Sequence, residues 1–129
     1  MAEKRTKTQQ RREQLFTLVF QLPYLDYEAE DLPKDTYSAA VLSALKEHLA
    51  DIDARIESHL APGWKLFRLA KPTLAVLRLG VCELEYMDKI PTGATINEMV
   101  NLAKRYGDDG NCPRFVNGVL GAIAREKAE

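Results

Sequence analysis

Three side chains near the C-terminal end of the chain combine a cation, an aromatic ring and an amide. The sequence from residue 114 reads RFVNGVLGAIA, which places Arg114, Phe115 and Asn117 at the start of an expected helix. Proteins hold single-stranded RNA with cationic side chains on its phosphates and aromatic rings stacked on its bases. The N-terminal end of a helix also attracts anions. This cluster therefore favours a ligand with flat rings and negative charge.

The same residues also allow a structural interpretation. Phe115 fits the apolar face of its own helix, and on the sequence alone a core position explains it better. Asn117 can tie that helix to a neighbouring backbone through a hydrogen bond. Both interpretations stay open at this point.

A second candidate group lies at the start of the chain, although the whole protein has a net charge of only −1. A local cluster can bind an anion even in a nearly neutral protein, and a solvated terminus is the alternative. The two groups can form one docking groove for an RNA strand only if the basic arm and Phe115 lie side by side. The arm, residues 1–7, and the residues that follow it contain Lys4, Arg5, Lys7, Arg11 and Arg12.

The sequence offers little for catalysis or metal binding. It contains none of the motifs GxSxG, HExxH and GxxxxGK, and GDDGN lacks the spacing of a calcium loop. His48 and His59 are eleven residues apart, and Cys82 and Cys112 belong to no CxxC pair. We therefore expect no enzymatic activity, no metal, no cofactor and two free thiols.

The length of 129 residues fits one domain over residues 1–129. The longest apolar runs are far too short to cross a membrane, and the residues after Met1 do not form a signal peptide. We therefore expect a cytoplasmic protein without a membrane segment.

Apolar residues recur with helical spacing along nearly the whole chain, so we expect an all-α helical bundle. The spacing predicts a first helix over about 8–22, closed by Pro23. A long second helix follows over about 36–60, capped by Asp35 or Thr36. A short apolar turn follows at 64–69.

A third helix begins at Pro72 and should be central, because the stretch 74–84 is apolar nearly all round. Its polar exceptions, Arg78 and Glu83, are five residues apart and face different ways. Each therefore needs a partner on another element, since an unpaired buried charge is costly.

Two further helices complete the bundle. Thr95 and Glu98 match a capping box, which predicts a fourth helix from Thr95 to Tyr106. The last helix begins at residue 111 or 112. Gly118 and Gly121 weaken that helix by about 1 kcal/mol each relative to alanine, so we expect another helix to approach closely there.

Several segments in this order resemble the NusB family of transcription antitermination factors. They are RREQLFTLVFQL, LRLGVCEL, IPTGATINEMVNLAKRYG and RFVNGVLGAIA. The resemblance covers most of residues 8–126 and is strongest over 72–124. It implies two packed helical subdomains that bind the boxA element of ribosomal RNA leader transcripts. The ribosomal protein NusE is the implied protein partner, within the antitermination complex on RNA polymerase.

The resemblance also implies roles for single residues. Arg11 and Arg12 fall near the family's arginine-rich start of the first helix. Phe115 falls on its RNA-facing phenylalanine, and Asn117 on its helix-start asparagine. The chain departs from the family at Thr73, where an acidic residue near the ribosomal partner is common.

A second departure lies in TKTQQRRE, where glutamines replace two of the family's arginines. Two consequences stay open: RNA affinity is weaker than in the family, or Lys4, Arg5 and Lys7 of the arm take the place of the missing arginines. The alternative function is a helical protein-interaction module without RNA contact, like the helical domain fused to some RNA methyltransferases.

Overall fold

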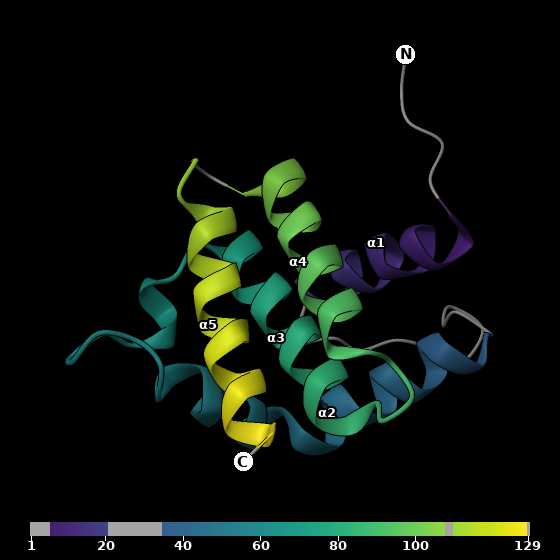
Figure 1. The fold of residues 1–129 in the computed structure, drawn as a ribbon, viewed down its shortest axis with the longest axis horizontal. Helices are drawn as coiled ribbons and strands as arrows, with labels where there is room; N and C mark the ends of the chain where they lie inside the picture. The colour runs from purple at the N-terminus through teal and green to yellow at the C-terminus, as the bar shows by residue number, and fades with distance from the viewer. Residues whose placement is uncertain (1–5, 21–34, 108–109, 129) are drawn as a thin grey trace.

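The computed structural model describes residues 6–20, 35–107 and 110–128, which form helices and no strand (Figure 1). The all-α prediction is confirmed. None of the helices in these ranges is both long and apolar enough to cross a membrane. The elements are α1 (Lys7–Val19), α2 (Thr36–Glu57), the short 3-10 helix η2 (Leu66–Arg68), α3 (Lys71–Tyr86), α4 (Thr92–Tyr106) and α5 (Cys112–Ala128).

Helix α3 is the centre of the bundle, as its apolar sequence predicts. It packs against α1, α2, α4 and α5, and α4 and α5 run side by side along it (Figure 1). Its Leu77, Leu79 and Val81 side chains are fully buried. Each such side chain contributes roughly 1.5–3 kcal/mol by leaving water.

The ends of α1 differ from the prediction. The helix begins at Lys7 because Thr6 and Gln9 form a reciprocal cap. The Gln9 amide donates to the Thr6 hydroxyl at 3.1 Å, and the Thr6 amide donates to the Gln9 side chain at 3.0 Å. The helix ends at Val19, and the predicted stop at Pro23 lies outside the described residues.

Helix α2 starts as predicted, with the Asp35 carboxylate accepting from the Ser38 amide at 2.8 Å. It ends at Glu57 rather than at residue 60, and it is kinked at His48. The His48 ring stacks on Tyr86 of α3, with the ring centroids 4.1 Å apart. This stack holds α2 against α3 at the kink.

The predicted capping box of α4 is wrong. Helix α4 begins at Thr92, with Pro91 in the capping position and no side-chain cap. Thr95 therefore lies one turn inside the helix and is fully buried. Its hydroxyl donates to the Glu83 carboxylate at 2.9 Å instead of capping its own helix.

Glu83 joins four helices although it is almost completely buried. Arg12 of α1 donates to its two oxygens at 2.9 and 3.0 Å. Tyr37 of α2 and Thr95 of α4 donate as well.

Burial alone would lower the pKa of Arg12, but the hydrogen bond and charge of Glu83 outweigh it and raise that pKa. Burial also raises the pKa of Tyr37, and Glu83 raises it further, so Tyr37 stays a donor.

The second polar residue of α3 also has a partner, as predicted. Arg78 donates twice to Asp53 of α2, both times at 2.8 Å. The expectation that each charge of α3 pairs with another element is therefore confirmed for both residues.

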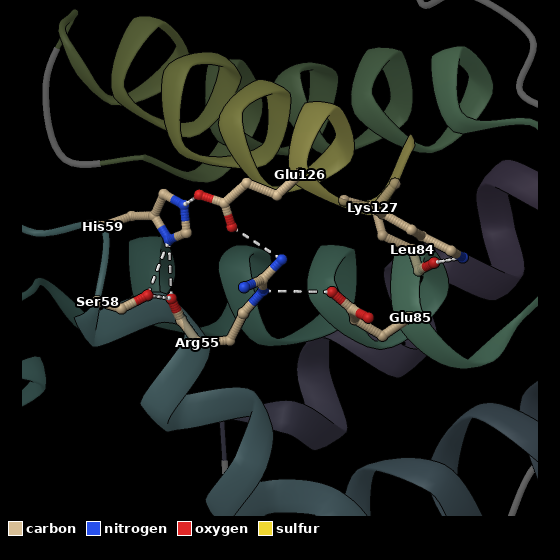
Figure 2. A network of polar contacts seen from close by, with 7 residues as sticks. All are labelled: Arg55, Ser58, His59, Leu84, Glu85, Glu126 and Lys127. Atoms are coloured by element: carbon tan, nitrogen blue, oxygen red, sulfur yellow. Dashed lines mark hydrogen bonds and ion pairs between the residues drawn. The ribbon is translucent and has the colours of Figure 1, made fainter. Parts of the chain in front are cut away.

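A third polar network fastens the C-terminal end of α5 (Figure 2). Arg55 of α2 bridges Glu85 of α3 at 3.4 Å and Glu126 of α5 at 2.9 Å. His59 lies 2.8 Å from Glu126, and Lys127 donates to the Leu84 carbonyl. The far end of α5, which carries Phe115, is free of this network.

The expected close approach at Gly118 and Gly121 is wrong. A Cβ at Gly118 would meet nothing within 4 Å, and one at Gly121 would meet only Arg125 of its own helix at 3.5 Å. The close approach occurs at Gly80 of α3. A Cβ there would lie 2.7 Å from Leu120 and 3.0 Å from Met99, so Gly80 lets α4 and α5 settle onto α3.

Alanine at these glycines should therefore have opposite effects on stability. Gly118→Ala should raise the free energy of unfolding by about 0.5–1 kcal/mol, because it removes backbone freedom without a clash. Gly80→Ala should lower it by about 1–3 kcal/mol through overpacking of a closed core. Urea denaturation followed by circular dichroism measures both. A stabilising Gly80→Ala would contradict this packing.

Removing the charge of Glu83 should cost far more than removing an exposed charge. Glu83→Gln leaves Arg12 buried without a counter-charge and adds a donor among donors, so we expect a loss of about 3–5 kcal/mol. The matched control, Glu126→Gln at an exposed ion pair, should cost at most about 1 kcal/mol. Urea denaturation of the two variants tests this, and equal losses would argue against the network.

Candidate nucleic-acid interface

The cluster that opens α5 lies at the surface. Arg114 and Asn117 are exposed, and Phe115 is half-buried. The Phe115 amide donates to the Asn111 carbonyl at 2.9 Å, which places Asn111 where the helix begins. The three predicted side chains therefore come from the first two turns of α5, at the positive end of its dipole.

The Phe115 ring is partly a core residue and partly a surface residue. One part of it packs against the buried core, while another part lines an open cavity. For Asn117, no hydrogen bond to a neighbouring backbone is present in the described part of the chain. The hydrogen bond that would give Asn117 a purely structural role is therefore absent from the described residues.

The basic start of the chain contributes less surface charge than expected. Lys4 and Arg5 lie outside the described residues. Lys7 is exposed and belongs to the first turn of α1 rather than to an arm. Arg11 is partly exposed and lies 3.7 Å from Asp35. Arg12 is buried against Glu83, so its guanidinium does not face solvent.

The two predicted groups do not lie side by side. Figure 1 shows the start of α1 and the start of α5 on opposite sides of α4. The expected single groove over both groups is therefore not formed by the described residues, and a strand that reaches both has to pass over α4.

The C-terminal end of α4 supplies residues that the sequence analysis overlooked. Lys104, Arg105 and Tyr106 are exposed and lie at the end of α4 that leads to α5 (Figure 1). Arg105 pairs with Glu13, and Tyr106 stacks on Phe16 with centroids 5.0 Å apart. The sequence KRY at residues 104–106 places two cations beside an aromatic ring. This combination is typical of RNA-binding surfaces and could have identified the position from the sequence. Lys104 adds positive charge between the two predicted groups, whereas Glu13 balances the charge of Arg105.

The cavity beside Phe115 has a volume of about 460 Å³. It lies between the first turn of α5, the start of α3 and the connection that precedes η2. Trp64, Arg68, Leu69, Thr73 and Cys112 are among the residues that line it. In the wall of this cavity the Thr73 hydroxyl oxygen lies 3.1 Å from the Cys112 sulfur, and both residues are buried.

The thiols and histidines do not form a reactive or metal-binding centre in the described residues. Cys82 and Cys112 are buried and are not joined in a disulfide. Burial, with a contribution from Glu83, raises the pKa of Cys82 to about 12, which keeps this thiol protonated and poorly nucleophilic at neutral pH. Within the described ranges, no three His, Cys, Asp or Glu residues gather where they could hold a metal ion.

Comparison with known proteins identifies relatives that match most of the chain. The sequence model of the NusB family matches residues 3–125. The transcription antitermination protein NusB of Lacticaseibacillus casei is 45% identical over 119 residues, which cover 84% of this chain and 87% of that protein. The NusB protein of Lysinibacillus sphaericus is 36% identical over 128 residues, 94% of this chain and 99% of its own length.

Two solved structures share the fold over nearly the whole chain. NusB of T. maritima superposes with a TM-score of 0.79 and 32% identity, covering 95% of this chain and 94% of its own. A chain from a crystal structure of a plectonemic RNA supercoil has a TM-score of 0.79 and 28% identity, covering 94% and 96%. With most of its sequence and its helical order shared in this way, the chain belongs to the NusB family of transcription antitermination proteins.

Proposed function

We propose that this protein is a cytoplasmic transcription antitermination factor that binds boxA-type single-stranded RNA of ribosomal RNA leader transcripts. It does so together with the ribosomal protein NusE, within the antitermination complex on RNA polymerase. The observation that carries the proposal is that two neighbouring residues at the start of α5 reach the surface. Arg114 is exposed, and Phe115 is half-buried. Membership of the NusB family and the similar chain solved with an RNA supercoil support it.

The exposed residues take distinct roles in this proposal. Phe115 stacks on a base, Arg114 contacts a phosphate, and Asn117 hydrogen-bonds the strand one turn further along α5. The strand continues over the cations at the end of α4, Lys104 and Arg105. It ends at cations near the start of α1, namely Lys4, Arg5, Lys7 and Arg11.

Arg12 has a supporting role in this proposal. Its side chain is 6% exposed and is committed to Glu83, so a phosphate could reach it only by breaking a buried ion pair. We assign to Arg12 the task of holding α1 at the angle that presents its exposed cations.

The surface that meets NusE does not include the Thr73 side chain. Thr73 is 7% exposed and lies against Cys112, so it offers a protein partner little contact area. Phe67, which is exposed and lies outside the cavity wall, favours the alternative, a protein-interaction module without RNA contact. Size-exclusion chromatography with NusE, with and without boxA-type RNA, separates the two functions. Co-elution that ignores the RNA supports the alternative.

Salt dependence tests the RNA surface directly. With about four phosphate contacts, log affinity for a short boxA-type RNA should fall with log salt at a slope of about −3. Arg114→Gln should make that slope about 0.7 shallower, because one contact is lost. Fluorescence anisotropy at several salt concentrations measures both values. Arg125→Gln, an exposed cation at the other end of α5, is the matched control and should change nothing.

Phe115 should contribute through stacking rather than charge. Phe115→Leu keeps the part of the side chain that packs on the core, yet removes the flat ring. We expect a loss of about 1–3 kcal/mol in RNA binding with the salt slope unchanged. Wild-type affinity in a folded Phe115→Leu variant would remove Phe115 from the RNA surface, and absence of any RNA binding by the wild type would refute the proposed function.

A further inference from the structure

We infer that the cavity beside Phe115 holds one unstacked base of the bound RNA strand, with the indole ring of Trp64 as its stacking platform. This inference rests on the proposed function and extends it to a second nucleotide subsite. Neither Trp64 nor Arg68 was among the residues that the sequence marked as candidates.

The size and walls of the cavity suit a flat, mostly apolar group. Its volume of about 460 Å³ falls within the range of roughly 300–1,000 Å³ typical of small-ligand sites. Leu60, Leu69 and Ala70 supply apolar wall on the side of α2 and α3, and Phe115 supplies it on the side of α5. A base would bury its faces there at little desolvation cost.

Trp64 is arranged as a platform. Its side chain is 45% exposed although it borders an apolar cavity, so part of its ring remains available to a ligand. The Arg68 guanidinium lies 5.4 Å from the ring centroid and holds the indole through a cation–π contact. Arg68 also lines the cavity, where it can reach the phosphate of a stacked nucleotide.

The charge around the cavity selects an anion. Among the described lining residues, Arg68 is the one charged side chain, and none is acidic. Exposed Lys71 and Arg114 flank the site at the starts of α3 and α5, and both helix dipoles are positive there. The nearby carboxylate of Glu57 is bound to Lys65 and to the Leu66 amide. A flat ring with an attached phosphate matches this combination better than an aliphatic or cationic side chain.

The cavity is also continuous with the proposed RNA surface. Phe115 belongs to both, and Arg114 is its neighbour in the chain. A strand whose phosphate rests on Arg114 can therefore turn its next base into the cavity, where none of the described lining residues is acidic.

The chain provides its own reporter for this subsite, because Trp64 is its single tryptophan. Titration of the full-length protein with a short boxA-type RNA should quench the indole emission with the same midpoint as the anisotropy of the labelled RNA. Trp64→Leu should weaken RNA binding roughly 5- to 150-fold, the range for loss of one base–aromatic stack.

Phe67→Leu is the matched control, since Phe67 is 82% exposed, lies three residues away and is not part of the cavity wall. We expect wild-type affinity for this variant. Circular dichroism checks that both variants are folded. Arg68→Gln should weaken binding and make the salt slope shallower, as expected for a lost phosphate contact.

The outcomes separate this inference from the proposed function. If RNA binds but the Trp64 emission stays constant and Trp64→Leu binds normally, the subsite is refuted and the proposed function stands. If no RNA binds, both fail. If NusE alone quenches Trp64 and added RNA changes nothing further, the cavity holds a protein side chain and the inference is overturned.

Discussion

The structure depends on the hydrogen bonds that surround one buried carboxylate at its centre. Glu83 is 1% exposed, and a charge at that depth is stable only when donors surround it. The donors come from α1, α2 and α4, so three helices must take definite positions around α3 at once. Apolar packing alone tolerates small shifts between helices, whereas a set of hydrogen bonds to one carboxylate does not. Glu83 therefore fixes the placement of α1, α2 and α4 around α3, while close packing at Gly80 lets α4 and α5 approach α3.

This constraint determines which cations remain for a ligand. Arg11 and Arg12 are neighbours in the sequence, yet the helix turns them to different sides. Arg12 reaches the buried carboxylate, while Arg11 stays partly exposed near Asp35. The positive surface consequently consists of residues that the core does not need, at the end of α4, the start of α5 and the start of α1. The proposed binding surface and the core network thus share α1 but divide its arginines between them.

Much of the fold follows from the sequence because helical periodicity and turn residues are local signals. The central position of α3 and the need of Arg78 and Glu83 for partners could be read directly. The errors arose where a tertiary contact overrides a local pattern. Thr95 matches a capping box, but the buried carboxylate of Glu83 takes its hydroxyl. Helical glycines look alike in a sequence, and only the packing reveals that Gly80, and not Gly118, meets a neighbouring helix.

The candidate site shows the same division between local and tertiary information. The sequence alone marked Arg114 and Phe115 as a cation beside an aromatic ring. It could not show that Trp64, far away in the chain, borders the same cavity as Phe115. Nor could it choose between core and surface for Phe115, since the ring serves both. That dual position has a physical consequence for recognition. A ring held on one side by the core has already lost most of its rotational freedom, so stacking a base on its other side costs less entropy than ordering a free side chain.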